Sequence, residues 1–80
     1  MITEEKIRGL LNEIRPEIDF SQSADFIADG LIDSMDVIQL TALMQSEFGI
    51  DIDVLEIVPE NFGSVESLLS LAVRSASSNS

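Results

Sequence analysis

Asp33 and Ser34 are the residues of this sequence whose types and setting point most clearly to chemistry. A turn at Gly30 precedes them, and an apolar segment of helical length, running to Phe48, follows them. Asp and Ser are both favoured N-cap residues, so the pair marks the start of a helix. The Ser34 hydroxyl then lies where unpaired backbone N–H groups and the positive end of the helix dipole favour an anion. A phosphate ester on Ser34 suits this position; the simpler alternative is that Ser34 only caps the helix.

The other side chains offer little for catalysis. The 80 residues contain no histidine, cysteine, tyrosine or tryptophan, and only four lysines and arginines. Histidine is the commonest general base and metal ligand, and without cysteine there is no disulfide or thiolate metal site. We therefore expect a protein that is not an enzyme, with no assigned metal ligands, in a reducing compartment.

The charge of the chain limits its partners. Fifteen acidic residues against four basic ones give a formal net charge of −11. Such a chain repels nucleic acid and anionic membrane surfaces and is attracted to basic patches on other proteins, although the same charge can simply keep a small domain soluble. No apolar run has the length of a membrane span, and residues 1–5 lack the basic region of a secretory signal. We expect a cytoplasmic monomer that neither binds nucleic acid nor inserts into membranes.

The first third of the chain predicts a helix and a long connection. Thr3 is a favoured N-cap, and Pro16 disfavours helical geometry at Arg15, so the first helix should end there. Its buried stripe follows helical spacing and comprises Ile7, Leu10, Leu11 and Ile14. The connection from 16 to 33 is too long to be structureless in a small domain. Its apolar residues indicate that it packs across the helices as an ordered loop.

Three further helices are expected after this loop. A second helix spans 34–48, a short third one spans 54–58 before a proline, and a fourth runs from 64 to about 74. The sequence thus predicts an all-α fold: a small four-helix bundle with a long ordered loop between helices one and two and a short third helix. Residues 1–74 form one domain, and 75–80 are expected to be a disordered polar tail.

The second predicted helix is apolar on two faces. One stripe comprises Val37, Leu40, Thr41, Met44 and Phe48, and the other comprises Met35, Ile38 and Ala42. Because a helix of a small bundle needs only one buried stripe, the second face is either covered by the long loop or exposed as a docking surface for other proteins. On the second alternative, Asp36 and Gln39 would form its polar rim.

Three segments together resemble the acyl carrier protein family. They are Gly30-Leu31-Ile32-Asp33-Ser34-Met35-Asp36, Phe48-Gly49-Ile50, and Pro59-Glu60-Asn61-Phe62 followed by Ser64-Val65. The resemblance covers most of the chain, from the first amphipathic segment to about Ala72. It implies that Ser34 carries covalent 4′-phosphopantetheine, attached by a phosphopantetheinyl transferase that uses Mg²⁺ and coenzyme A, and that Asp33 supports the attachment. The arm would hold an acyl or aminoacyl group as a thioester.

The same resemblance implies partners and a pathway class. The partners would be an acyl- or aminoacyl-loading enzyme and downstream transferases or synthases, docking on Met35, Asp36, Ile38, Gln39 and Ala42. Methionine replaces the usual leucine after the serine, a change that conserves volume. Carriers of fatty acid synthesis present an acidic second helix, but Gln39, Gln45 and Ser46 stand at the corresponding positions here, and the connection from 48 to 64 looks longer. We therefore favour a carrier of a specialised biosynthetic pathway over the housekeeping fatty acid carrier.

Two readings of another class remain open from the residues. The first is a divalent-cation module, since six residues match positions 1, 5, 6, 8, 9 and 12 of an EF-hand loop: Asp25, Asp29, Gly30, Ile32, Asp33 and Asp36. Ile27 at position 3 cannot ligate through its side chain, and position 12 is Asp rather than Glu. Weak stabilising cation binding would be compatible with a carrier. The second reading is an acidic helical interaction module that never receives the arm.

Overall fold

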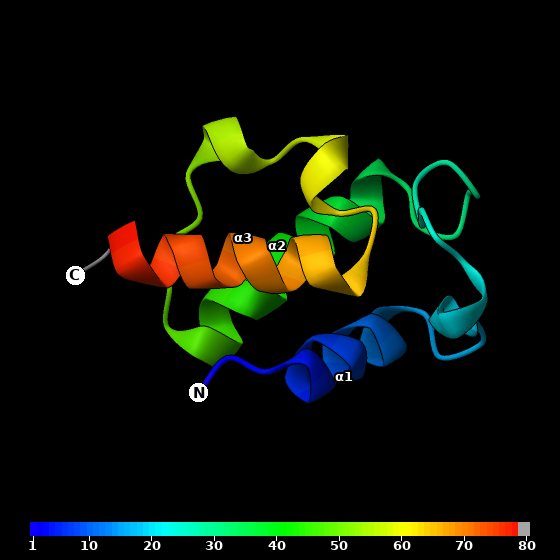
Figure 1. Ribbon diagram of the computed structural model, residues 1–80, viewed down its shortest axis with the longest axis horizontal. Helices are drawn as coiled ribbons and strands as arrows, with labels where there is room; N and C mark the ends of the chain where they lie inside the picture. Colours follow the sequence, from blue (N-terminus) through cyan, green and yellow to red (C-terminus); the bar gives the residue numbers. More distant parts are fainter. Residues whose placement is uncertain (79–80) are drawn as a thin grey trace.

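Residues 1–78, the part of the chain that the computed structural model describes, form three α-helices and three short 3₁₀ helices (Figure 1). The α-helices are α1 (Glu4–Ile14), α2 (Ser34–Phe48) and α3 (Val65–Ser78). The 3₁₀ helices are η1 (Phe20–Gln22), η2 (Val54–Glu56) and η3 (Pro59–Asn61). Helix α1 packs against both α2 and α3, and η3 packs against α3. None of the helices within 1–78 is long and apolar enough to cross a membrane.

The all-α class is confirmed, but the count of four helices was wrong for the described part of the chain. Where a short third helix was expected, the backbone makes one 3₁₀ turn, η2, and then a second, η3. The Asp53 carboxylate accepts the N–H of Leu55 at 2.9 Å, which closes a tight local turn instead of capping a longer helix. Pro59 begins η3, because its fixed φ suits a first helical position.

The predicted boundaries of α1 and α2 are confirmed by their caps. The Thr3 hydroxyl accepts the N–H of Lys6 at 3.2 Å at the start of α1, and Arg15 is the C-cap residue. Helix α2 ends at Gly49, which is left-handed with φ 64° and ψ 34°. Residues with a Cβ are strained in this region, so glycine is the residue that allows the chain to turn here.

Two glycine substitutions should change the free energy of unfolding in opposite directions. We expect Gly49→Ala to lower it by about 1 kcal/mol, because the new Cβ is strained at positive φ. Gly9→Ala is the matched control: Gly9 lies within α1 with nothing within 4 Å of an added Cβ, so alanine should raise it by roughly 0.5–1 kcal/mol. Urea denaturation measures both. Equal effects of the two changes would contradict the assigned cap.

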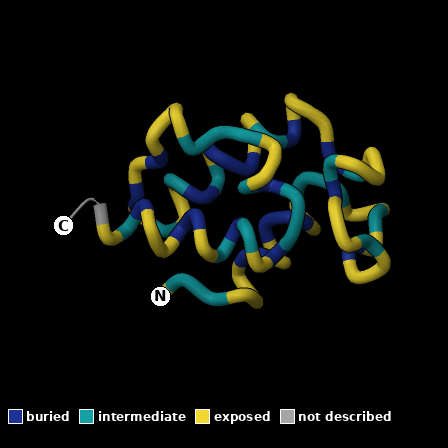
Figure 2. Tube along the Cα trace, turned by 45° about the horizontal axis from the view of Figure 1, so that its top comes forward, coloured by how far each residue is buried: buried dark blue, intermediate teal, exposed yellow. Residues whose placement is uncertain are grey.

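The core draws its side chains from the three α-helices and from the connections between them. Figure 2 shows buried positions recurring along the helices and in the connections between them. Eight large side chains are at most about 2% exposed: Ile7, Leu11, Phe26, Leu40, Met44, Phe62, Leu68 and Leu71. The connections thus contribute two of the largest buried residues, Phe26 and Phe62, and the short chain completes its core with loop residues.

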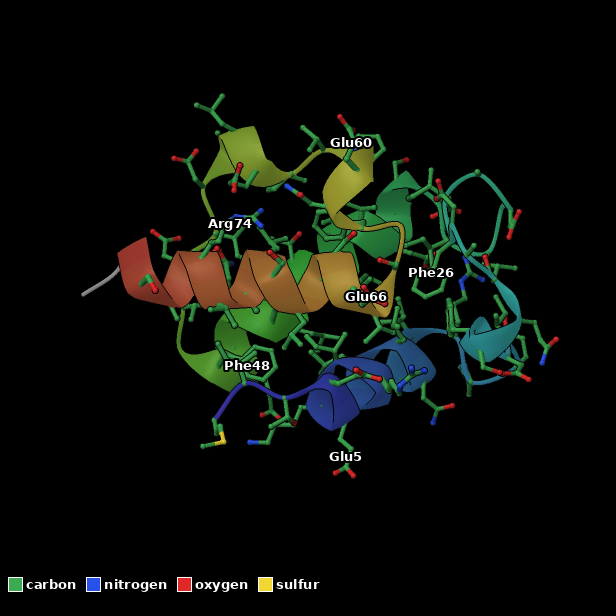
Figure 3. The ribbon with its side chains drawn as sticks, viewed as in Figure 1. Glu5, Phe26, Phe48, Glu60, Glu66 and Arg74 are labelled. Atoms are coloured by element: carbon green, nitrogen blue, oxygen red, sulfur yellow. The ribbon has the colours of Figure 1, made fainter. Side chains whose placement is uncertain are left out.

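The long loop between α1 and α2 is ordered and packed, as predicted. Phe26 donates its N–H to the carbonyl of Gly63 at 2.7 Å, and its own carbonyl accepts the N–H of Leu31 at 2.8 Å. The Phe26 ring meets the Phe20 ring edge-on at 4.9 Å between centroids. In Figure 3 the Phe26 side chain lies between the loop and the beginning of α3. The loop is therefore fixed to the turn before α3, which defines where α2 can begin.

Helix α3 is longer than expected. The Ser64 hydroxyl accepts the N–H of Ser67 at 3.0 Å, which confirms Ser64 as the residue that caps it. The disordered tail predicted from residue 75 is wrong for residues 75–78, which continue the helix, and Ser75 is only 6% exposed. Residues 79–80 of that predicted tail lie outside the described residues. Arg74 pairs with Glu56 of η2 at 3.1 Å, and Figure 3 shows it extending from α3 toward that segment.

Candidate functional site

Ser34 is the first residue of α2, and it is exposed. Asp33 before it has extended backbone geometry (φ −119°, ψ −172°) and is the N-cap. The N–H groups of Ser34 and Met35 belong to the first turn of the helix, where no preceding helical carbonyl is available to accept them. The hydroxyl therefore stands in open solvent at a helix tip whose partial positive charge suits a phosphate ester.

Asp33 and Asp36 close a reciprocal capping box around Ser34. The Asp33 Oδ1 atom accepts the N–H of Asp36 at 3.0 Å, and the Asp36 Oδ2 atom accepts the N–H of Asp33 at 3.0 Å. Both bonds satisfy backbone donors that a helix start leaves unpaired. The position of Ser34 is thus fixed by its neighbours, and its own hydroxyl is not needed for capping.

Arg15 joins this capping box from the end of α1. Its Nε atom donates to Asp36 Oδ1 and Oδ2 at 3.1 and 3.0 Å, and its Nη2 atom donates to Oδ2 at 2.9 Å. Nη2 also lies 3.7 Å from Asp33 Oδ2. Sequence reasoning did not connect Arg15 with the site, because the two partners are 21 residues apart and no spacing rule relates them.

The environment of Asp36 stabilises its charged form. Burial raises the pKa of Asp36, but the hydrogen bond from Arg15, the backbone N–H of Asp33 and the Arg15 charge together lower it below its usual range. The hydrogen bond to Asp36 likewise raises the pKa of Arg15. The pair is therefore fully ionised at neutral pH, and its stabilising effect depends on Asp36 remaining a carboxylate.

This pKa shift predicts a pH-dependent stability difference for Asp36→Asn. Because folding lowers the pKa of Asp36, its contribution is complete above the pKa of an unfolded aspartate, about 3.9, and is lost as the pH falls through the lower folded value. We expect the variant to be less stable than wild type by about 1–2 kcal/mol at pH 7, a value reduced by the exposure of Arg15. The difference should shrink below about pH 4.

Urea denaturation between pH 7 and pH 2 measures that difference. The pKa of Asp19 is lowered mainly by the Ser21 hydroxyl, so its contribution to stability is also lost as the pH falls. This contribution is the same in wild type and variant and cancels in the difference between them. Glu5→Gln controls for the loss of one negative charge, since Glu5 is exposed on α1 (Figure 3). A stability difference for Asp36→Asn that did not vary with pH would show that its charge is not the stabilising feature.

An apolar groove of about 340 Å³ lies beside Ser34. Its apolar lining comes from the long loop, the first turns of α2 and the segment that leads from η2 into the start of η3: Ile27, Val37, Ile38, Ile57, Val58 and Pro59. A larger hollow of about 420 Å³ lies near η2 and the end of α3, but its lining includes three carboxylates and Arg74. The groove at Ser34 is therefore the cavity whose chemistry suits an apolar group attached to that hydroxyl.

The second apolar face of α2 is not covered by the long loop. Met35 is 64% and Ile38 is 61% exposed, and Gln39 and Ala42 are exposed beside them. Asp36, expected at the rim of this face, is only 3% exposed. Its placement in the rim is a correction: the carboxylate turns inward because Arg15 and the backbone of Asp33 bind it there.

The carboxylates expected in a cation-binding loop have other partners. Asp25 Oδ1 accepts the N–H groups of Ile27 and Ala28, both at 3.1 Å, and Asp29 accepts the hydroxyl of Ser23. Asp36, the residue at position 12 of the loop, is bound by Arg15. Over residues 1–78 no group of three or more acidic side chains is placed to hold a metal ion. The geometry gives the EF-hand interpretation no support.

A small helical domain with an exposed serine at a helix tip, beside an apolar groove, has the features of a protein that bears a modification. The sequence matches the family described as "phosphopantetheine attachment site" over residues 5–72, and the chain belongs to this family. No curated protein and no solved structure shows significant similarity to the chain. The family assignment thus rests on the family match, and the fold and the site are consistent with it.

Members of this family carry 4′-phosphopantetheine covalently, so the protein is a phosphopantetheine-carrying carrier protein. Carrier domains of this kind are generally not catalytic themselves, and they interact with phosphopantetheinyl transferases and biosynthetic enzymes. The residues present fit such a group: an exposed hydroxyl, a helix tip that favours its phosphate, and an apolar groove beside it. When attached, the group supplies a flexible arm with a terminal thiol that can form a thioester.

Proposed function

We propose that Ser34 receives the phosphopantetheine arm and that the protein holds an acyl or aminoacyl group on it as a thioester for delivery to partner enzymes. The exposure of Ser34 at the tip of α2 is the observation that carries this proposal. Its hydroxyl is accessible to a second protein, and the capping box leaves it without a structural duty. Both features suit a residue that another enzyme must reach and modify.

The attachment reaction can be written with these residues in passive roles. The Ser34 oxygen forms a bond to the pantetheine-bearing phosphorus of coenzyme A, the bond from that phosphorus to the bridging oxygen breaks, and adenosine 3′,5′-bisphosphate leaves with the electron pair. The hydroxyl proton passes to a base on the transferase. Asp33, exposed beside Ser34, supports the attachment by helping to position the Mg²⁺ that accompanies coenzyme A. The chain itself then needs no general base.

The exposed face of α2 supports the proposed partner contacts. Met35, Ile38 and Ala42 form its apolar centre, with Gln39 as a polar neighbour. An apolar centre beside uncharged polar groups is the usual anatomy of an interface core. Because Asp36 is turned inward, this face has no exposed carboxylate between residues 35 and 46. Its partners would therefore bind it mainly through apolar contacts.

This composition favours a carrier of a specialised pathway. A housekeeping fatty acid carrier presents an acidic second helix to basic partners, whereas the face described here is close to neutral. The intact mass of the protein isolated from its native source tests the proposal. It should exceed the mass of the unmodified protein by one phosphopantetheinyl group plus an acyl or aminoacyl cargo. A ladder of malonyl and growing fatty acyl masses would instead identify the housekeeping carrier.

The arm itself is tested by incubation with a broad-specificity phosphopantetheinyl transferase, Mg²⁺ and coenzyme A. We expect the wild-type protein to gain the mass of one phosphopantetheinyl group, and fragmentation to place that mass on Ser34. A protein that stays unmodified while a known carrier is modified in the same reaction would contradict the proposal. It would favour an interaction module that lacks the arm.

A further inference from the structure

Arg15 forms an ion pair unlike the other ion pairs of the described chain. Arg8 pairs with Glu4, and Arg74 pairs with Glu56, between side chains that are each at least 41% exposed. The Asp36 side chain is only 5% exposed, while that of Arg15 is 35% exposed. Exposed pairs between long side chains contribute little to stability, whereas removing the partner of a buried charge is strongly destabilising. Arg15 is therefore the basic residue on which a buried carboxylate depends.

The pair fixes the start of α2 relative to the end of α1. The backbone of Arg15 is held by α1, since its N–H donates to the carbonyl of Leu11 at 3.0 Å. Its guanidinium grips both oxygens of Asp36, and Asp36 Oδ2 also accepts the N–H of Asp33. A fork-shaped donor on two carboxylate oxygens sets an orientation as well as a distance. The residue immediately before Ser34 is thus tied, through Asp36, to a different helix.

The pair also balances charge beside the modification site. Asp33 and Asp36 place two carboxylates within three residues of Ser34, where a phosphate ester would add further negative charge. Arg15 lies 2.9 Å from one of these carboxylates and 3.7 Å from the other. At such distances a cation offsets much of their repulsion toward an incoming phosphate.

We propose that Arg15 is a positioning residue for Ser34: through Asp36 it holds the first turn of α2 in place and offsets the charge of the two carboxylates, so that the hydroxyl is presented to the transferase. This inference rests on the proposed function. It assigns Arg15 no contact with the arm or with the transferred phosphate. Its effect on transfer should therefore act mainly through Asp36, with a smaller direct part from its charge beside Asp33.

Transfer kinetics on the full chain test the role of Arg15. With a broad-specificity transferase and coenzyme A, Arg15→Met should lower kcat about tenfold, because the hydroxyl is less well oriented. The KM for the carrier should stay within about twofold, because the exposed face of α2 is unchanged. Arg8→Met, which removes the same charge from the same helix, should leave both constants within about twofold.

Amide hydrogen exchange separates positioning from general loss of structure. In Arg15→Met, exchange should become about tenfold faster at the Asp36 amide, whose N–H caps onto Asp33, while the Leu40 amide of the same helix keeps its wild-type rate. Arg15→Lys keeps the charge but loses the fork, so it should recover part of the lost kcat. If Arg15→Met does not fold, Arg15→Lys carries the test, with a smaller loss of kcat and faster exchange confined to the first turn.

A double-variant comparison decides whether Arg15 acts through Asp36. Adding Arg15→Met to Asp36→Asn should lower kcat by no more than about twofold further, because only the exposed contact with Asp33 remains to be lost. A second tenfold loss, or a rise in KM, would show that Arg15 contacts the transferase directly and would overturn the proposal. Wild-type kcat in Arg15→Met would overturn it too. In each case wild-type modification at Ser34 leaves the proposed function standing, whereas an unmodified wild-type protein rejects the function itself.

Discussion

Ser34→Ala should abolish the attachment of phosphopantetheine, reducing the mass gain from one arm per chain to none. The change removes the oxygen on which the new ester bond must form. It should cost little stability, within about 0.5 kcal/mol, because Ser34 is exposed and Asp33, not Ser34, provides the capping bond. Alanine also favours a helical position. Intact-mass spectrometry after incubation with transferase and coenzyme A measures the loss, and circular dichroism confirms the fold.

Ser46→Ala is the matched control for this experiment. Ser46 is an exposed serine of the same helix, but it lies near the C-terminal end of α2, where no positive helix tip is available. The Ser46 variant should gain the full mass of the arm. A Ser34→Ala protein that still gained the mass would place the attachment on another hydroxyl, and the assignment of the site would have to be abandoned.

Phe26→Ala should cause one of the two largest losses of stability among truncations outside the α-helices, together with truncation of Phe62. Phe26 is 2% exposed, packs against Phe20 and fixes the loop to Gly63. Truncation of a buried phenylalanine costs about 3–5 kcal/mol, and a chain of this size has a total stability of only about 5 kcal/mol. We therefore expect the variant to be largely unfolded at 25 °C, as measured by urea denaturation and by the loss of dispersed amide signals.

Leu55→Ala controls for the removal of a large apolar side chain from a connecting segment. Leu55 is 80% exposed in η2, so its truncation should change the free energy of unfolding by less than about 0.5 kcal/mol. A Phe26→Ala protein that lost less than about 1 kcal/mol would mean that the loop is not an integral part of the core. The order of the loop that leads to Ser34 would then need another cause.

The parts of the fold that sequence predicted well depend on local rules. Thr3 and Asp33 could be identified as N-caps because capping acts within three residues, and Gly49 could be identified as a C-cap because only glycine adopts its backbone conformation without strain. The packed loop was predictable from the apolar residues around Phe26. These local signals are sufficient to predict that Ser34 lies at the start of a helix.

The features that sequence did not predict depend on contacts between distant residues. Asp36 was predicted to lie on the surface because no residue near it in the sequence indicates that Arg15 is its partner. Helix α3 extends past residue 74, and Ser75 in this extension is buried in the fold. The polar composition of the segment from residue 75 onward gives no indication of this burial. The groove beside Ser34 needs Ile57 and Pro59 from a connection that forms 3₁₀ turns where a helix was expected. Each of these outcomes is decided by packing across the fold.

The exposure of Met35 has a consequence for the redox sensitivity of the protein. Met35 is 64% exposed beside Ser34, whereas Met44, on the inner side of the same helix, has no exposed surface. Mild peroxide should convert Met35 to its sulfoxide well before Met44, since access governs this oxidation. A sulfoxide is polar, so it would place a dipole at the apolar centre of the exposed face. We therefore expect oxidant stress to weaken the partner binding proposed for α2 while leaving the core, and the hydroxyl proposed to bear the arm, intact.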